Sequence, residues 1–242
     1  MKYLSTILAL TAAIATFATP TAQAESRLQV EIPIENVFAP KGFDDNDSAE
    51  VVVSGMLQNL CYKAPRATAT IEGNVIRIKV TALHVRTEGT YCASMWVPFT
   101  EVVSLGVIRS GSYTVKVISQ PEDQPLETSL AVVQASTSSI DDFVYANVDW
   151  IETFKNSHRV VLHGYNPSDC FELDSIQLVS NQKDAYSVLP IMKQVRETCP
   201  MKMVPFAYEM QVPNELDARK ILLHTRVLNG KSVNAIFYNV VE

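Results

Sequence analysis

The sequence lacks the short motifs that identify most enzymes. Its 242 residues contain no Gly-x-Ser-x-Gly elbow, no HExxH helix, no phosphate-binding loop and no dinucleotide fingerprint. A Ser, His and Asp triad is defined by geometry and not by order along the chain, so a hydrolase stays open as an alternative. We therefore expect a protein that binds rather than catalyses, and we expect no cofactor.

Helical periodicity is almost absent as well. Beyond residue 24, apolar and polar residues alternate with a period of two, and in residues 75–80 this places Ile76, Ile78 and Val80 on one face. The one helix that we expect is short and begins near Pro190. The pattern predicts an all-β protein built from antiparallel β-sandwiches.

Long apolar stretches are confined to the beginning of the chain. Lys2 precedes an apolar run over residues 4–17, and Ala22-Gln23-Ala24 presents small side chains before Glu25. This order predicts a signal peptide at residues 1–24 that is cleaved after Ala24. The alternative, a retained membrane helix, needs about 20 apolar residues, and the run ends earlier. We expect a periplasmic or secreted protein without a transmembrane segment in its mature part.

Basic residues are too few for a nucleic-acid or anionic lipid partner. The chain has 20 Lys and Arg against 26 Asp and Glu, and loss of residues 1–24 removes one Lys, so the net charge changes from −6 to −7. Such a surface does not attract polyanions. The partner that we expect is another envelope or extracellular protein; the sequence does not indicate an oligomeric state.

Four cysteines are present, all of them beyond the predicted signal peptide. An even number in an oxidising compartment favours two disulfides, for which three pairings are possible. Cys61 and Cys92 are 31 positions apart, and Cys170 and Cys199 are 29 apart. The two similar intervals suggest that the chain contains an internal repeat.

The repeat is visible in longer segments. CASMWVPF at residues 92–99 returns as CPMKMVPF at 199–206, and VVVSG at 51–55 returns as VVLHG at 160–164, each six residues before a cysteine. We interpret this as a tandem duplication that gives two β-sandwich modules, residues 25–136 and 137–242, joined near residues 135–139. Each module then closes its own disulfide, Cys61 with Cys92 and Cys170 with Cys199. The proline of each VPF segment predicts the edge of a sheet or the beginning of a strand.

The first module ends in GSYTVKV at residues 111–117, followed by one more strand pattern. This Gly-x-Tyr-x-Val-x-Val segment resembles the immunoglobulin-like (Ig-like) sandwiches of bacterial exported proteins, and the resemblance implies that fold for each module. Two small sandwiches in a chain of this length also resemble periplasmic pilus chaperones, although the paired basic anchor residues of that family are not recognisable here. A pilus-chaperone-like protein is therefore an alternative function.

The segments that contain the second cysteine of each pair also contain candidate binding residues. Trp96 alternates with Val97 and Phe99, so it points away from the side that they share. An exposed tryptophan on a rigid sheet edge is suited to anchor a partner. We therefore predict binding residues Met95, Trp96, Met201 and Met203. The alternative is that Trp96 covers the disulfide.

Two histidines of the second module are candidate metal ligands. His163 and His224 both lie in strand patterns, and with Met201 or Met203 they would offer imidazole and thioether ligands suited to copper. A metal-handling protein or a hydrolase that uses these histidines is the second hypothesis. The alternative is that each histidine faces solvent or makes a local hydrogen bond.

Residues 44–50 form a dense acidic segment that imitates the beginning of a calcium loop. The sixth position is Ala49 where such a loop has glycine, and the twelfth is Gly55 where it has glutamate. We expect a solvated acidic loop, with weak calcium binding as the alternative.

Overall fold

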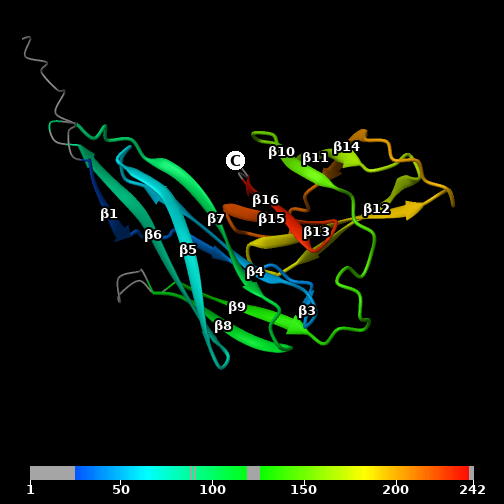
Figure 1. The fold of residues 1–242 in the computed structure, drawn as a ribbon, viewed down its shortest axis with the longest axis horizontal. Helices are drawn as coiled ribbons and strands as arrows, with labels where there is room; N and C mark the ends of the chain where they lie inside the picture. Colours follow the sequence, from blue (N-terminus) through cyan, green and yellow to red (C-terminus); the bar gives the residue numbers. More distant parts are fainter. Residues whose placement is uncertain (1–24, 88, 90, 119–125, 240–242) are drawn as a thin grey trace, which may run out of the picture.

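The computed structural model describes residues 25–87, 89, 91–118 and 126–239, which form strands, turns and loops (Figure 1). The predicted signal peptide, residues 1–24, lies outside the described residues and stays a prediction. No helix in the described part of the chain is long and apolar enough to cross a membrane. The all-β prediction is confirmed.

Two sheets form the N-terminal half, which comprises β1 to β9. In the smaller sheet the strand order is β2-β4-β7, where β2 is Asn36–Phe38, β4 is Ala49–Leu57 and β7 is Val97–Gly106. The larger sheet is built on β6 (Val75–Thr87), which has β5 (Tyr62–Glu72) on one side. On its other side lie β1 (Glu25–Glu31) and β8 (Gly111–Val117), and the sheet continues through β9 (Leu126–Val133) to β3 (Phe43–Asp44). Apolar side chains from both sheets form one core.

The C-terminal half, β10 to β16, repeats this arrangement. Its smaller sheet has the order β10-β11-β14, with β10 at Val148–Thr153, β11 at Arg159–Asn166 and β14 at Val204–Gln211. The larger sheet has the order β12-β13-β15-β16, with bounds Phe171–Ser180, Ala185–Gln194, Lys220–Val227 and Lys231–Tyr238. A second core lies between these sheets. The order β5-β6-β8-β9 in the first half therefore corresponds to β12-β13-β15-β16 in the second.

The two larger sheets are mixed, which corrects the prediction of purely antiparallel sandwiches, whereas the two smaller sheets are antiparallel throughout. β8 runs parallel to β6, and β15 runs parallel to β13. In each case the intervening strand, β7 or β14, lies in the opposite sheet. The chain thus crosses the sandwich and returns in its original direction, which is the connection that a parallel pair requires.

Each VPF segment begins an edge strand, as the sequence predicts. β7 begins at Val97 and β14 at Val204, and each strand has one ladder partner among the described residues, β4 for β7 and β11 for β14. The proline at the second position lacks an N–H to donate, and a strand edge tolerates this loss. Val97 and Phe99 pack against the first core, as their spacing indicates.

The two halves are joined through a buried apolar contact. Phe38 and Val52 of the N-terminal half form a cluster with Ala185 and Leu222 of the C-terminal half, and Ile236 packs against it. Figure 1 shows β13, β15 and β16 lying beside β3 and β4. β13 and β15 of the larger C-terminal sheet are therefore covered on both faces, by their own core on one side and by the N-terminal half on the other.

The prediction of a short helix near Pro190 is wrong. Pro190 lies inside β13, opposite Ile176 of β12. The strand is buried on both faces, because Tyr186 and Val188 enter the second core while Ala185 belongs to the cluster between the halves. A strand buried on both faces has no clean alternation, so its apolar run cannot be told from a buried helix by periodicity alone.

Candidate binding surface

The two disulfides join Cys61 to Cys92 and Cys170 to Cys199, with Cα–Cα distances of 5.6 and 5.5 Å. The second cysteine of each pair lies a few residues before an edge strand, β7 or β14. Exposed side chains occupy the intervening segments. They are Met95 and Trp96 in the first half, and Met201 and Met203 in the second.

The predicted binding residues are thus all on the surface. Trp96 is 62% exposed and Met201 is 99% exposed, so neither covers its disulfide. Their neighbours Val97 and Val204 begin strands; Val97 packs against the first core, and Val204 is half-buried. Each half therefore presents large apolar side chains to solvent on a segment that a disulfide constrains.

The outer side of the β10-β11-β14 sheet holds a second group of exposed rings. Val160 and Leu162 of β11 enter the core, so the alternating residues of the same strand face outward. Across the sheet, Trp150 lies opposite His163, His163 opposite Ala207, and Tyr165 opposite Pro205. We call this surface the aromatic face and define it by five residues: Trp150, His163, Tyr165, Pro205 and Ala207.

The aromatic face is ordered by ring stacking and a hydrogen bond. The indole of Trp150 stacks on the imidazole of His163, with ring centroids 3.9 Å apart and planes at 6°. His163 Nε2 lies 2.9 Å from Glu152 Oε2, which fixes the orientation of the imidazole. Trp150 remains 51% exposed and Tyr165 44% exposed. Rings held rigidly in solvent lose little conformational entropy when a partner covers them, which suits them to binding.

The predicted pairing of His163 with His224 is wrong. His163 lies on the outer face of the smaller C-terminal sheet, where it contacts Trp150. His224 lies on the outer face of the larger sheet, where it contacts Phe43 and Glu50 of the N-terminal half. The whole sandwich separates the two rings. Among the described residues, no three His, Cys, Asp or Glu side chains come together as a possible metal site.

His224 belongs instead to a polar network between the halves. Its Nδ1 is 2.9 Å from Asn234 Oδ1 and 3.2 Å from Glu50 Oε1, and the Ser232 hydroxyl donates to the same carboxylate oxygen. Nε2 is buried without a hydrogen-bond partner. Burial lowers the pKa of His224 below its ordinary value, although Glu50 and Asn234 act in the opposite direction. Burial therefore favours the neutral form of this histidine, and Glu50 and Asn234 oppose that effect.

The acidic segment at residues 44–50 is not the solvated loop that we predicted. Asp47 is buried and forms a two-pronged ion pair with Arg226, with Oδ1–Nη2 and Oδ2–Nη1 distances of 2.5 and 2.8 Å. Asp45 accepts a 2.8 Å hydrogen bond from the Ala135 amide, and the Asn46 side-chain amide donates to the Thr137 carbonyl at 2.9 Å. These side chains organise the junction between the halves.

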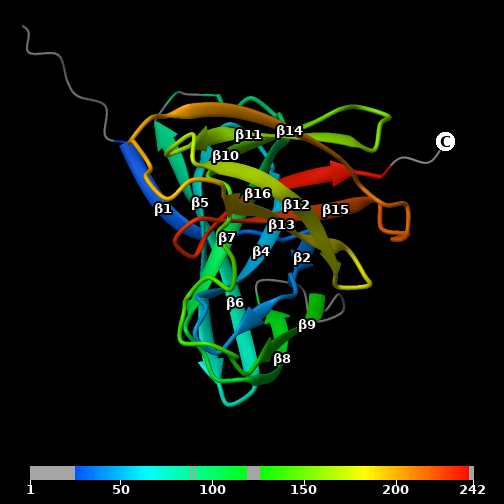
Figure 2. The same cartoon turned by 90° about the vertical axis from the view of Figure 1, so that its right-hand side faces the viewer.

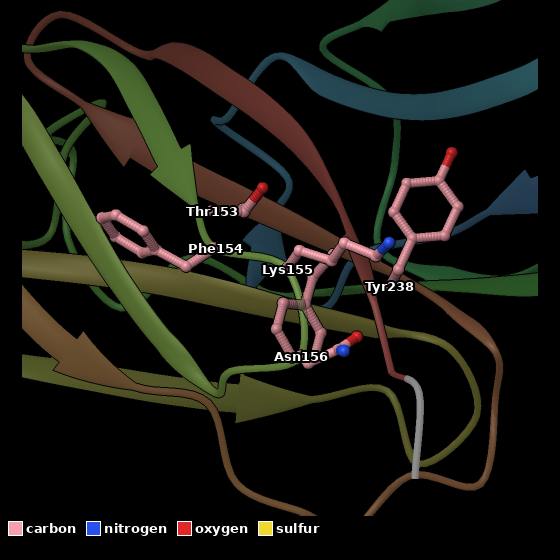
Figure 3. Close-up of a pocket in the computed structure, with 6 residues that line it drawn as sticks. Thr153, Phe154, Lys155, Asn156 and Tyr238 are labelled. Atoms are coloured by element: carbon pink, nitrogen blue, oxygen red, sulfur yellow. The ribbon is translucent and has the colours of Figure 1, made fainter. Parts of the chain in front are cut away.

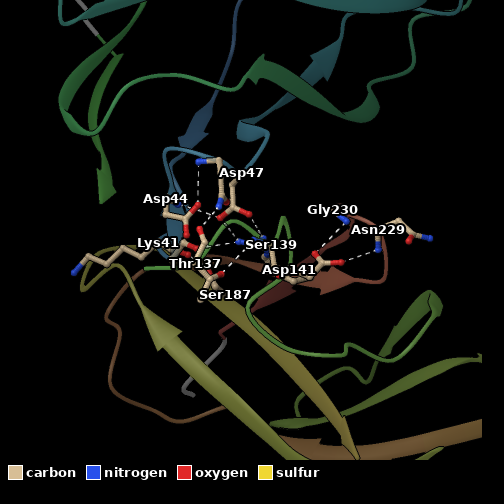
Figure 4. A network of polar contacts seen from close by, with 12 residues as sticks. Lys41, Asp44, Asp47, Thr137, Ser139, Asp141, Ser187, Asn229 and Gly230 are labelled. Atoms are coloured by element: carbon tan, nitrogen blue, oxygen red, sulfur yellow. Dashed lines mark hydrogen bonds and ion pairs between the residues drawn. The ribbon is translucent and has the colours of Figure 1, made fainter. Parts of the chain in front are cut away.

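The same junction is anchored from the C-terminal side (Figure 4). The Asp141 carboxylate accepts hydrogen bonds from the Asn229 and Gly230 amides at 3.0 and 3.2 Å. The Ser187 hydroxyl donates to the Lys41 carbonyl at 2.5 Å. Burial also raises the pKa of Asp44 above its ordinary value. The junction is thus a dense polar contact and not a flexible linker.

A pocket of about 480 Å³ lies where the end of β10 meets the end of β16 (Figure 3). Its lining combines apolar rings with the ammonium group of Lys155, and the residues are Thr153, Phe154, Lys155, Asn156, Phe237 and Tyr238. Arg159 borders it, with its guanidinium 4.7 Å from the centre of the Phe154 ring and its Nε 2.9 Å from Glu209 of β14. The pocket is therefore a neighbour of the sheet that carries the aromatic face.

Trp150 and Tyr165 are the binding candidates that sequence reasoning missed. In RVVLHGYN, residues 159–166, the inward pair Val160 and Leu162 implies an outward His163 and Tyr165, so alternation could have identified them. Trp150 carries a weaker signal. The register shifts between Val148 and Trp150, and such an irregularity in a ladder is not visible in the sequence.

Comparison with known proteins shows that one family model matches less than half of the chain. The ORF11 beta-sandwich domain model matches residues 51–132, a stretch that begins within β4 and ends within β9 of the N-terminal half. No curated protein matches the chain, and no solved structure matches it. The β-sandwich fold is thus supported by both the family match and the structure.

Proposed function

We propose that this protein is an exported, non-enzymatic binding protein made of two disulfide-closed β-sandwich modules that arose by tandem duplication. The equal strand order of the halves supports the duplication, as does the position of each disulfide ahead of an edge strand. Two structural disulfides support an oxidising compartment, in the periplasm or outside the cell. The Ig-like character of each module stays a prediction, as does the resemblance to pilus chaperones.

The observation that carries the binding role is the aromatic face. Trp150 and Tyr165 expose large apolar surfaces on the same face of the sheet. Tryptophan and tyrosine are enriched among the residues that dominate binding energy at protein interfaces. Ala207 and Pro205 complete a surface with few flexible side chains, and the ion pair of Arg159 with Glu209 adds charge beside it. This combination of an apolar centre and a charged rim is typical of a protein-binding surface.

The partner that we propose is another envelope or extracellular protein. The net charge of the mature chain, −7, does not favour nucleic acid or an anionic membrane. Met95 and Trp96 offer a second exposed surface in the N-terminal half. Variants of the two surfaces distinguish them, because each surface contains an exposed tryptophan that can be removed separately.

Cross-linking and co-purification of the mature chain from its native envelope and medium test the proposal. Wild type is compared with Trp150→Ala/Tyr165→Ala and, as the matched control, Trp96→Ala. We expect a specific protein that the wild type and the control recover equally and that the double variant does not recover. Equal recovery by all three chains would contradict the proposal, and loss with Trp96→Ala alone would place the binding surface in the N-terminal half.

A further inference from the structure

Among the described residues β14 pairs with β11 alone, and we call its other side the free edge; the hydrogen bonds of β11 show which groups point into that edge. The Tyr165 amide donates to the Asn147 carbonyl on the β10 side, at 3.2 Å. Tyr165 therefore directs its backbone groups away from β14, so its pairing with Pro205 contains no ladder hydrogen bonds. Because the direction alternates along a strand, Ala207 and Glu209 direct their N–H and C=O groups to the free edge.

A second hydrogen bond at the end of the strand agrees. The Val212 amide donates to the His158 carbonyl at 2.8 Å, so the backbone groups of this even-numbered residue point toward β11. The backbone N–H and C=O groups of the odd-numbered residues of β14 consequently point to the free edge. Pro205 is one of these residues and has no N–H. The free edge thus offers the amides of Ala207, Glu209 and Gln211 to an added strand.

The side chains next to this edge are incompletely covered. Phe206 and Tyr208 stack with centroids 4.2 Å apart and are half buried at the margin of the second core. In the N-terminal half, β5 runs beside β7, the edge strand that corresponds to β14. The counterpart of β5 in the C-terminal half is β12. In the described part of the chain, β12 makes no comparable contact with β14. Figure 2 shows β14 along the outer margin of its sheet. In the described residues the edge of β14 is therefore uncovered, whereas the corresponding edge of β7 is covered by β5.

From the backbone directions and the uncovered rings, we infer that β14 accepts an extended segment of a partner protein as an additional strand. This inference rests on the proposed binding function and specifies the chemistry of the partner. Alternate apolar side chains of the segment would cover Phe206 and Tyr208, while backbone hydrogen bonds would form to Ala207 and Glu209. The other side chains would extend the aromatic face. Glu209 already pairs with Arg159, so it is the excess of 26 acidic over 20 basic residues in the chain that favours Lys or Arg there.

Hydrogen exchange on the wild-type mature chain tests the inference with a defined probe. The probe is the synthetic peptide acetyl-KVTVKVTVK-amide, which alternates valine with basic and hydroxyl residues. Its control has the same composition with the valines placed in adjacent pairs. We expect the alternating peptide to slow exchange of the amides of Ala207, Glu209 and Gln211, and the control peptide to leave them unchanged. Unchanged exchange at these amides with the alternating peptide would overturn the inference.

A proline variant removes one hydrogen bond of the proposed added strand. Ala207→Pro deletes an amide that faces the free edge, so the ladder with β11 is kept, and unfolding in denaturant verifies that the variant folds. We expect the peptide to bind roughly five- to tenfold more weakly, the effect of one lost hydrogen bond. Ala207→Thr is the matched control: it changes the side chain but keeps the amide, so the difference in affinity between the two variants isolates the lost hydrogen bond. Equal affinity of the proline variant and the wild type would contradict strand addition.

The two proposals fail separately. Loss of the native partner with Trp150→Ala/Tyr165→Ala, together with full retention by Ala207→Pro, would keep the binding function and reject strand addition. Retention of the native partner by both variants would reject both.

Discussion

Phe99 of β7 lies directly opposite Gly55 of β4, and its ring occupies the space that a β-carbon at residue 55 would need. A β-carbon there would be 2.9 Å from Phe99 Cζ and 3.0 Å from the Pro33 carbonyl oxygen. The C-terminal half has the same pair, Gly164 opposite Phe206. The glycine of each VV-x-x-G segment is thus the cross-strand partner of the phenylalanine of each VPF segment, which explains why both segments occur twice.

This pairing predicts unequal effects of two alanine substitutions. Gly55→Ala should cost about 1 to 3 kcal/mol of unfolding free energy, the usual range for overpacking, because the Phe99 side chain can move. Gly164→Ala should cost more, because the added carbon would lie 2.0 Å from the Asn147 carbonyl oxygen, which is backbone. Denaturant unfolding measures both values. Adding Phe99→Leu should recover part of the Gly55→Ala loss, and an equal or smaller loss for Gly164→Ala would contradict the pairing.

Local patterns of the sequence predicted much of the fold. Alternation in residues 75–80 corresponds to β6, the prolines of both VPF segments lie at the beginning of edge strands, and the cysteine spacing matches the disulfides that the structure contains. These features depend on neighbours along the chain. The relative direction of the strands is harder to predict from sequence. β6 and β8 run parallel because β7, which lies between them in the chain, joins the opposite sheet, and the local pattern does not show which sheet a strand joins.

The contacts between the halves could not be read from the sequence. Asp47 and Arg226 are separated by 179 positions, and their charges alone predict two solvated residues. His224 lies in an alternating strand whose outer face would be solvated in an isolated sandwich, but the N-terminal half covers it. Docking of two folded surfaces determines these environments, and no periodicity within either half encodes it. For the same reason, the sequence did not reveal that His163 and His224 lie on different sheets of the C-terminal sandwich.

Each disulfide closes a loop of similar length, so each should contribute a similar entropic stabilisation. The separations are 31 and 29 residues, for which the chain-entropy relation gives roughly 3 to 4 kcal/mol. We expect Cys61→Ala/Cys92→Ala to lose about that amount in denaturant unfolding. Cys170→Ala/Cys199→Ala should lose somewhat more, because Cys170 is fully buried and its removal leaves unfilled space. A loss below about 1 kcal/mol for either pair would show that the bond does not constrain the unfolded chain as this relation requires.

Trp96 should be unimportant for folding. Because it is 62% exposed, Trp96→Ala is expected to lower the unfolding free energy by less than about 1 kcal/mol. Phe99→Ala, three residues along the same segment, serves as a buried comparison and should cost about 3 to 5 kcal/mol. Thermal or denaturant unfolding of the two variants checks this difference. Comparable losses would place Trp96 in the core and remove it as a binding residue.

The ion pair between Asp47 and Arg226 should hold the two halves together. Both side chains are buried, and Arg226 also donates to the Gly42 carbonyl at 2.9 Å. Burial alone would lower the pKa of Arg226, but the hydrogen bonds and charge of Asp47 outweigh it and raise that pKa. Arg226→Met leaves the Asp47 carboxylate buried without its partner, so we expect a loss of about 3 to 5 kcal/mol.

A double-mutant cycle separates the pair from the other contacts of its members. Asp47→Leu/Arg226→Met should be less destabilised than the sum of the two single variants, because neither charge is then left alone. Denaturant unfolding of the four chains gives the coupling free energy. Strict additivity would show that the two charges do not stabilise each other.

His224 should make the protein less stable as the pH falls below about 6.5, the ordinary pKa of histidine. Because burial lowers the pKa of His224 in the folded state, the unfolded chain binds its proton first. The stabilisation from this residue is therefore fully present above about pH 6.5 and is lost as the pH falls toward the lowered folded pKa, with a slope of up to about 1.4 kcal/mol per pH unit. Glu50 and Arg226, the charged groups that face the imidazole, act in opposite directions on this pKa.

The unfolding free energy of wild type and His224→Asn, measured from about pH 7.5 to about pH 5 across the ordinary histidine pKa, isolates this contribution. We expect the wild type to lose stability faster than the variant, because the substituted asparagine side chain cannot be protonated in the unfolded chain. Asp44 and Asp184, whose pKa values burial raises, have the opposite sign: their stabilisation is present at low pH and is lost as the pH rises. They are common to both chains and cancel in the difference. Parallel curves for the two chains would mean that folding leaves the protonation of His224 unchanged.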